Sequence, residues 1–173
     1  IRFLGRNNTL NDLIVTDVGE GFYPATSQIG TLSTIKSRKV NTGALVLTGN
    51  SNVNITSLET SEASNDILVI NYTGNTNLIN AVLNFSNINW TNGSFSGQIN
   101  RKYDYEVVIS DSVGSPLANT SLSLVDIRGD SIFLSTTNSL GTIPSQTITR
   151  AIYDYNSRSG EERGAIRRGH RFS

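Results

Sequence analysis

An internal repeat limits the folds open to this chain more than any other feature. The stretch TGNSNV at Thr48–Val53 returns as TGNTNL at Thr73–Leu78, and a short aliphatic run precedes each copy, ALVL in the first and ILVI in the second. Aligned from these runs, Ala44–Asp66 and Ile67–Asn89 are two segments of 23 residues. A period of roughly 20–30 residues, made of short apolar segments and Asn/Gly turns, is typical of a β-solenoid, in which each coil buries its apolar face against the next.

The residues within the repeat favour this interpretation. Polar and apolar residues alternate through Asn52–Ile55, so a strand here has one apolar and one polar face. Gly49 and Gly74 are expected at equivalent corners, where glycine supplies the positive φ angle. Val46 and Val69 are predicted to stack about 4.8 Å apart on successive coils.

Upstream of the repeat the pattern is weaker. The stretch LGRNNTLNDLIV at Leu4–Val15 resembles the first copy when Gly5 is aligned with Gly49, 44 residues away and close to two coils. The intervening Phe22–Val40 is less regular and is expected to form an aberrant coil or a loop. Two similar β-hairpins within a sandwich are the alternative to a solenoid, and the repeat alone does not exclude them.

Composition favours an all-β protein. Asn, Ser and Thr contribute 20, 22 and 18 of the 173 residues, while Lys numbers three and Met is absent. Such uncharged polar side chains suit turns and exposed strand faces and form helices poorly. Charged residues make up 16% of the chain, below the roughly 25% of an average globular protein.

Charge and cysteine content narrow the partners and the setting. The formal net charge is zero, so nothing steers the chain toward nucleic acid, and no apolar stretch is long enough for membrane insertion. Cys is absent, which excludes disulfides and thiolate metal sites. This composition is commonest on the surfaces of bacteria, archaea and viruses. Because the sequence starts at Ile1 without Met or a signal peptide, we interpret it as a processed or truncated piece of a longer chain.

The second half of the chain has a different texture. Tyr103–Ser110, Thr120–Asp126 and Ser131–Thr137 each alternate between apolar and polar residues, and turn residues separate them. Strands of six to eight residues at this spacing predict a small antiparallel sandwich. The predicted organisation is therefore a β-solenoid-like (parallel β-helix-like) segment over residues 1–100, followed by an Ig-like β-sandwich with a basic C-terminal tail over residues 101–173.

One stretch of this half resembles a known family. VISDSVGSPLANTSLSL followed by STTNSLGTI is similar to the Ig-like, carboxypeptidase-regulatory-type domains of archaeal and bacterial surface proteins. The resemblance covers about Tyr103–Tyr155, and Asn138 stands where the family usually has Asp. A β-solenoid running into such a domain also resembles surface-layer and adhesin-like proteins, which implies a structural or adhesive role and no catalytic residues. The matching residues are Asp111, Gly114, Pro116, Leu117, Thr136, Thr137 and Gly141.

Residues suited to catalysis are few. His170 in the tail is the only histidine, so a Ser-His-Asp arrangement or a multi-histidine metal site cannot be built from this chain. Acid pairs could serve glycoside chemistry, but the acids of the first half form no recognisable cluster and are expected to be solvated surface groups. These acids are Asp12, Asp17, Glu20, Glu59, Glu62 and Asp66.

Two motifs of the second half have plain structural explanations. Asp111, Asp126 and Asp130 lie near predicted turns and could bind Ca²⁺ through oxygen ligands, although turn capping accounts for them equally well. We therefore predict no cofactor and keep calcium as the alternative. The tripeptide Arg128–Asp130 (RGD) is recognised by integrins, but Gly-Asp between two strands is also an ordinary hairpin turn.

Asn-x-Ser/Thr motifs mark candidate N-glycosylation sites. Most fall in the first half, on predicted turns or outward faces. The candidates are Asn7, Asn54, Asn71, Asn84, Asn89, Asn92 and Asn119.

The chain ends are candidate subunit contacts. IRFLG begins inside a predicted strand, with Ile1 and Phe3 available to fill pockets, and the tail holds five of the eleven arginines together with Ile166 and Phe172. Strand addition between copies would satisfy such ends; the alternative is that both ends fold back on their own domain.

Together these features predict a non-enzymatic extracellular structural protein, a subunit of a cell-surface filament, surface layer or adhesin. Its expected partners are further copies of the chain, as a homo-oligomer or homopolymer, and surface glycans. The alternative is a virion, phage-fibre or tailspike structural protein with carbohydrate binding or cleavage, for which Trp90 and Tyr72 offer a small supply of aromatics.

Overall fold

The computed structural model describes residues 2–3, 8–24, 29–91, 93–125, 129–156 and 171–172, and the chain divides into two compact units. The first unit holds Ile1–Lys102 and Ile152–Glu161, and the second holds Tyr103–Ala151 and Glu162–Ser173. Buried aliphatic residues occur in both, so each unit has a core of its own.

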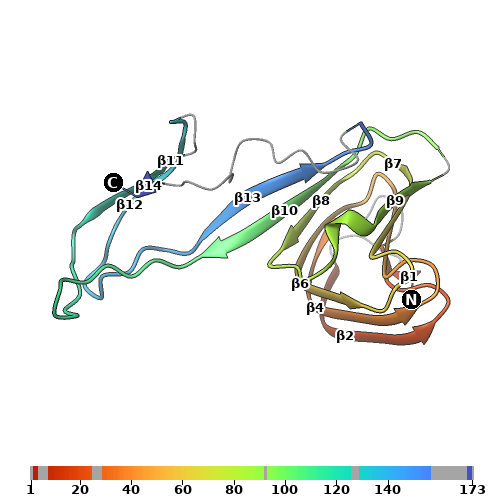
Figure 1. Ribbon diagram of the computed structural model, residues 1–173, viewed down its shortest axis with the longest axis horizontal. Helices are drawn as coiled ribbons and strands as arrows, with labels where there is room; N and C mark the ends of the chain where they lie inside the picture. Colours follow the sequence, from red (N-terminus) through yellow and green to blue (C-terminus); the bar gives the residue numbers. More distant parts are fainter. Residues whose placement is uncertain are drawn as a thin grey trace. The chain divides into compact units, whose positions relative to one another are not determined.

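Parallel strands stacked coil upon coil form the first unit (Figure 1). The larger sheet has the order β13-β10-β8-β6-β4-β2, the second sheet β5-β7-β9, and β1 pairs with β3. The chain is thus a β-solenoid here, and the two-hairpin alternative is wrong. The larger sheet comprises β2 (Asn8–Val18), β4 (Ile29–Val40), β6 (Asn52–Ser61), β8 (Asn75–Ile79), β10 (Gln98–Tyr105) and β13 (Gln146–Tyr153). The others are β5 (Leu45–Gly49), β7 (Ile67–Tyr72), β9 (Ile88–Thr91), β1 (Arg2–Phe3) and β3 (Tyr23–Pro24).

Helix is nearly absent from the described residues, as the composition predicts. The one helical segment among them is a short 3₁₀ turn, η1 (Phe85–Asn87), which Asn84 caps by accepting a hydrogen bond from the Ser86 amide at 3.0 Å.

The coils repeat every 22 or 23 residues. Asn8 of β2 pairs with Gly30 of β4, and Asn54 of β6 pairs with Asn77 of β8. The segment Phe22–Val40, expected to be aberrant or a loop, contributes a regular coil with the longest strand, β4. Its polar outward side chains hid the period, because only Leu32, Ile35, Ser37 and Val40 of its described side chains are buried.

The predicted alignment of the two repeat copies is wrong in register. Leu45 pairs with Ile67, so Val46 stacks on Leu68 rather than on Val69. A one-residue slip moves every side chain to the opposite face, and the observed register keeps the buried Leu45 and Ile67 together inside the core. An irregularity at Gly49 then restores the 23-residue spacing.

The two Thr-Gly pairs are likewise not equivalent. Gly49 has the expected positive φ of 57°. Gly74 instead lies against Ser51, where a Cβ would stand 2.0 Å from the Ser51 carbonyl oxygen. Glycine is needed at Gly74 for close approach between coils rather than for a left-handed turn.

Each coil bends at the same two places through residues with positive φ. The first column of such residues is Asp12, Thr34, Ser57 and Asn80, with φ angles of 57°, 52°, 59° and 53°. The second is Asp17, Lys39 and Glu62, with φ angles of 53°, 51° and 55°. These angles are uncommon outside glycine and asparagine, and their recurrence turns the long strands around the core.

Aliphatic side chains fill the interior between the two sheets. Val53 and Ile55 point inward while Asn52 and Asn54 are exposed, which confirms the predicted alternation. The fully buried side chains of the coils include Ile35, Leu45, Leu47, Ile55, Leu58, Ile67, Val69 and Leu78.

The second unit contains a three-stranded antiparallel sheet of order β12-β11-β14. Its strands are β11 (Ser121–Val125), β12 (Ser131–Thr136) and β14 (Arg171–Phe172), and Leu122 and Leu124 of β11 are buried as predicted. Alternation also holds through Tyr103–Ser110, but the regular strand β10 ends at Tyr105. The remaining residues make only isolated bridges, Val108 to Thr142 and Ser110 to Pro116.

Candidate functional site

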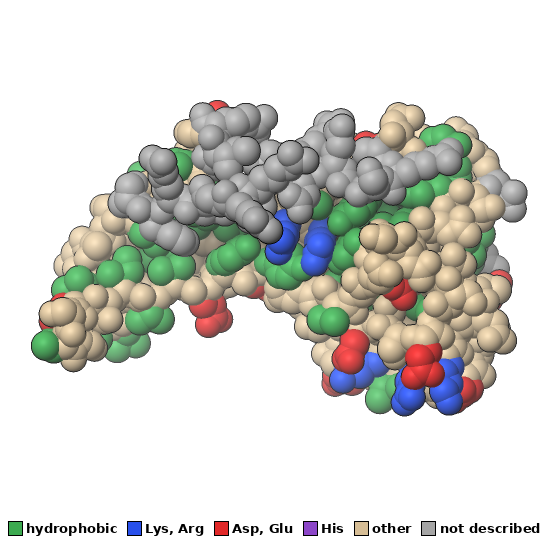
Figure 2. All heavy atoms as spheres, viewed as in Figure 1, with side chains coloured by type: hydrophobic (Ala, Val, Ile, Leu, Met, Phe, Trp, Pro, Cys, Tyr) green, Lys and Arg blue, Asp and Glu red, His purple; other side chains and the backbone are tan. Residues whose placement is uncertain are grey.

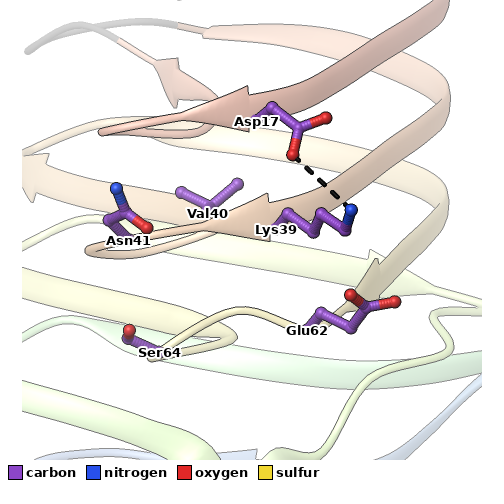
Figure 3. A pocket seen from close by; sticks show the side chains of 6 residues that line it. All are labelled: Asp17, Lys39, Val40, Asn41, Glu62 and Ser64. Atoms are coloured by element: carbon purple, nitrogen blue, oxygen red, sulfur yellow. Dashed lines mark ion pairs between the residues drawn. The ribbon is translucent and has the colours of Figure 1, made fainter.

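Charged side chains gather on the outer surface of β2, β4 and β6. Figure 2 shows Lys, Arg, Asp and Glu side chains crowded over this part of the coil stack. At one edge of it lies an open hollow with a volume of about 420 Å³ (Figure 3). The lining residues are Asp17, Lys39, Val40, Asn41, Glu62 and Ser64.

The second bend builds this hollow. Asp17, Lys39 and Glu62 occupy equivalent positions on three successive coils, and their positive φ angles turn the chain beside the opening. Lys39 lies between the two acids, with its Nζ 3.9 Å from Asp17 Oδ1. The side chain of Asp17 is 71% exposed, so this pair stabilises the bend only weakly.

Two further ion pairs join β4 to the next coil. Lys36 Nζ lies 3.0 Å from Glu59 Oε2, and Arg38 donates from Nη2 and Nε to Glu62 Oε1 at 2.8 and 3.0 Å. All four side chains are about half exposed. Exposed pairs contribute roughly 0.2–1 kcal/mol each, so they select a neighbour more than they stabilise the fold.

The charges are sorted by strand. Both charged residues of β2 are acidic (Asp12 and Asp17), all three of β4 are basic, and β6 carries the acidic Glu59. Register places these rows side by side, because Thr16 pairs with Arg38 and Lys36 pairs with Glu59. A basic coil is thus held between two acidic coils.

A ladder of asparagine side chains lies on another part of the outer face. Asn77 Nδ2 donates to Asn54 Oδ1 at 2.6 Å, and Asn100 Nδ2 donates to Asn77 Oδ1 at 3.1 Å and to Asn75 Oδ1 at 2.5 Å. Asn52 Oδ1 accepts from the Asn75 amide at 2.8 Å. These amides bind the next coil and leave little hydrogen-bonding capacity for a ligand.

The one strongly perturbed ionisable group described is inside the core. Tyr72 is fully buried, its hydroxyl lies 2.7 Å from Thr76 Oγ1, and it donates to the Ser51 carbonyl at 3.2 Å. Burial raises the pKa of this hydroxyl well above its ordinary value, and the Thr76 hydrogen bond lowers it to a smaller extent. Tyr72 therefore holds neighbouring coils together and is not available to contact a carbohydrate.

Aromatic rings cluster beside β9 at the far end of the coils. Trp90 meets Phe95 edge-on at 5.5 Å between ring centroids, and Phe95 stacks on Tyr155 at 4.7 Å. Nearby, Phe85 stacks on Tyr153 at 5.1 Å, and the Arg101 guanidinium lies 4.3 Å from the Phe85 ring centroid. The rings are engaged with one another, as in a cap over the last coil.

The acids of the first half are not all solvated surface groups. Asp66 is buried and its Oδ2 accepts a hydrogen bond from the Asn84 amide at 2.7 Å, so that expectation is wrong for Asp66. Glu59 and Glu62 are exposed but paired across coils. In the described ranges, no three or more His, Cys, Asp or Glu residues come together as a metal site.

Asp111 caps a turn, which is the alternative to a calcium role. Its Oδ1 accepts from the amides of Val113 and Ser115 at 3.0 and 2.8 Å. Asn138 makes the equivalent turn with the amides of Leu140 and Thr142, so the Asp-to-Asn change keeps the acceptor. Asp126 and Arg128 lie outside the described residues, and β11 and β12 on either side pair as an antiparallel hairpin.

The sequence-predicted glycosylation sites are on the surface wherever they are described. Asn54, Asn71, Asn84, Asn89 and Asn119 are all exposed, whereas Asn7 and Asn92 lie outside the described residues. The Oδ1 atoms of three of them already accept hydrogen bonds, from Asn77, Ser94 and Ser86 respectively.

Both predicted subunit contacts that are described pair within their own chain. Phe3 of β1 pairs with Pro24, and Phe172 of β14 pairs with Leu124. Ile1 and Ile166 lie outside the described residues. For Phe3 and Phe172 the main chain is therefore engaged, as the fold-back alternative requires.

Sequence reasoning did not find the sorted charges or the bend columns. The signal was present in the strand Ile29–Val40, whose three charges are all basic. Without its register against β2 and β6, however, that run reads only as a solvated face.

Comparison with known proteins adds no relative. No protein-family model, no curated protein and no solved structure matches the chain. Within the described part of the chain, none of the helical structure has the length and apolar character needed to span a membrane.

Proposed function

We propose that this chain is a non-enzymatic extracellular structural protein, a subunit of a cell-surface filament, surface layer or adhesin. One observation carries the proposal: in the coil stack, side chains with chemical potential are used to join one coil to the next. Glu59 and Glu62 pair with β4, and Asp66 binds the Asn84 amide. Such groups are unavailable as a free acid–base pair.

The second unit would serve as the docking or capping module. We propose that Tyr103–Tyr155 forms an Ig-like sandwich of the carboxypeptidase-regulatory type. The β11–β12 hairpin, the buried Leu122 and Leu124, and the capped turns at Asp111 and Asn138 support this proposal.

Assembly into a homopolymer would use sheet edges. Among the described strands, the outer side of β12 is unpaired, and Leu134 on this strand is 75% exposed. Unpaired edges are templates for a strand of another chain. The exposed Asn residues of the glycosylation motifs would carry sugar on the surface that remains free.

The tailspike alternative has less support. Carbohydrate-cleaving solenoids need an acidic groove lined with accessible aromatics. Here Tyr72 is fully buried, and Trp90 packs against Phe95 and Tyr155. A virion structural protein without such a groove differs from our proposal in location alone.

The proposal is tested on the purified chain in two arms. Sedimentation and negative-stain electron microscopy across a concentration series should show ordered polymers, and incubation with a panel of polysaccharides should release no fragments. A strictly monomeric chain at all concentrations would contradict the assembly part. Depolymerisation of any polysaccharide, lost on one Asp or Glu substitution, would overturn the non-enzymatic part.

A further inference from the structure

Strand β2 is the open edge of the coil stack. It ends the order β13-β10-β8-β6-β4-β2, and no described strand pairs with its outer side (Figure 1). It is also long, with 11 residues. A strand of this length offers a row of free amides and carbonyls to an incoming chain.

The charges of this edge are left partly unmatched. Asp17 has one distant partner, Lys39, and Asp12 makes no ion pair with any described residue. By contrast, β4 has acidic neighbours on both sides, in β2 and in β6. The pattern acidic–basic–acidic therefore stops at β2 with an acidic row that faces outward from the stack.

We propose that the β2 edge is a docking site for a parallel, basic β-strand of a partner protein. The incoming strand would resemble β4, with lysine or arginine beside the Ile14–Asp17 part of β2 and aliphatic side chains continuing the core beside Val15. Ile14, which is 68% exposed, would gain cover from the stem of a basic side chain, as β4 places Lys36 beside it in the stack.

The backbone of β2 specifies the direction of this strand. Bends at Asp12 and Asp17, with φ angles of 57° and 53°, match those of Thr34 and Lys39 in β4. A parallel strand with bends at the same spacing can follow the edge through both turns. An antiparallel strand would meet the bends in the reverse order and lose pairing beyond the first one.

Charge excludes a second copy of this chain as the occupant. A second β2 would bring acid against acid, and like charges on neighbouring strands repel. The basic strand β4 is paired on both sides within its own chain, so a second copy does not offer it. The occupant is therefore a different polypeptide with a free basic strand, and the inference does not depend on the chain forming a homopolymer.

A synthetic peptide with the β4 sequence, Ile29–Val40, is the direct probe of this edge. Its control is the same peptide with Lys36, Arg38 and Lys39 replaced by glutamate, which keeps every uncharged position. Fluorescence anisotropy on the full chain should show the basic peptide binding about tenfold or more tighter, a factor within reach of several exposed ion pairs acting together. Hydrogen exchange should then show new protection in β2 at amides that do not bond to β4.

A matched variant of the protein tests the charge rule from the other side. Lysine fits the backbone at position 17, because Lys39 adopts the equivalent angle in β4. Asp17→Lys should therefore weaken the basic peptide and strengthen the glutamate peptide, while Gly19→Ala should change neither. Asp17→Asn gives a milder form of the same test if the lysine variant unfolds.

Each outcome decides the inference. Selective binding with protection of β2 supports it. Equal binding of both peptides, protection confined to another strand, or no binding at millimolar peptide would overturn it. Self-association of the chain that the basic peptide displaces from β2 would also overturn it, in favour of a second copy as the occupant.

Discussion

Gly74→Ala should be among the most damaging single substitutions in the coil stack. Successive coils approach each other closely at this glycine. An added Cβ would lie 2.0 Å from the Ser51 carbonyl oxygen and 2.9 Å from Cε2 of Tyr72. The first is main chain and the second belongs to a fully buried ring, so neither can move away cheaply.

The cost follows from what must move. Non-bonded heavy atoms need about 3.5 Å, so the two coils would have to separate locally by about 1.5 Å out of a spacing of about 4.8 Å. That separation breaks the Tyr72 hydrogen bond to the Ser51 carbonyl and the Thr73 amide bond to Gly49. Two such bonds at about 1 kcal/mol each, with about 1–3 kcal/mol for overpacking, give a loss of about 3–5 kcal/mol.

Urea unfolding followed by Trp90 fluorescence measures this loss in the correct unit. Trp90 is the only tryptophan and lies in β9 of the coil stack. With an m-value of about 2 kcal/mol/M, the midpoint should fall by about 2 M. Gly19→Ala is the matched control, because a Cβ at Gly19 meets no atom within 4 Å. A Gly74→Ala midpoint as close to wild type as that of the control would refute the reasoning.

Three further predictions concern other positions in the coils. Because burial raises the pKa of Tyr72, only the unfolded chain loses this proton near pH 10; the unfolding free energy should fall above about pH 10, and urea titrations should show a shallower fall in Tyr72→Phe. Thr34→Asn should stabilise the chain by about 0.5–1 kcal/mol because threonine is strained at φ 52°, and equal stabilisation by Thr56→Asn in thermal unfolding would contradict this reason. Asn77→Ala should lower the unfolding free energy by about 1 kcal/mol through its lost ladder bonds, and an unchanged urea midpoint would show that the ladder is not stabilising.

The coil architecture could be predicted because its signal is local. The aliphatic runs at Ala44–Leu47 and Ile67–Ile70 alternate with Asn and Gly turns, and both runs lie in the core as expected. The register could not be predicted from the same letters. Thr-Gly looks equivalent in both copies, yet Gly49 serves a left-handed turn and Gly74 serves a close approach.

The bends and the charged surface were beyond sequence reasoning for a different reason. Asp17, Lys39 and Glu62 share one backbone conformation although their side chains differ in charge and length. Nothing in residue type marks them as equivalent, since tertiary packing of the coils imposes the angle. Once register is known, the sorted charges of β2, β4 and β6 follow directly from the sequence.

The recurring bends have a consequence for how such a chain can change in length. Every full coil turns at the same two places, so a unit of 22 or 23 residues can be duplicated or deleted while its neighbours keep their conformation. An insertion of one or two residues between the bends would instead move inward side chains to the outer face of that strand. Related genes should therefore differ by whole coils, each of which lengthens the stack by about 4.8 Å.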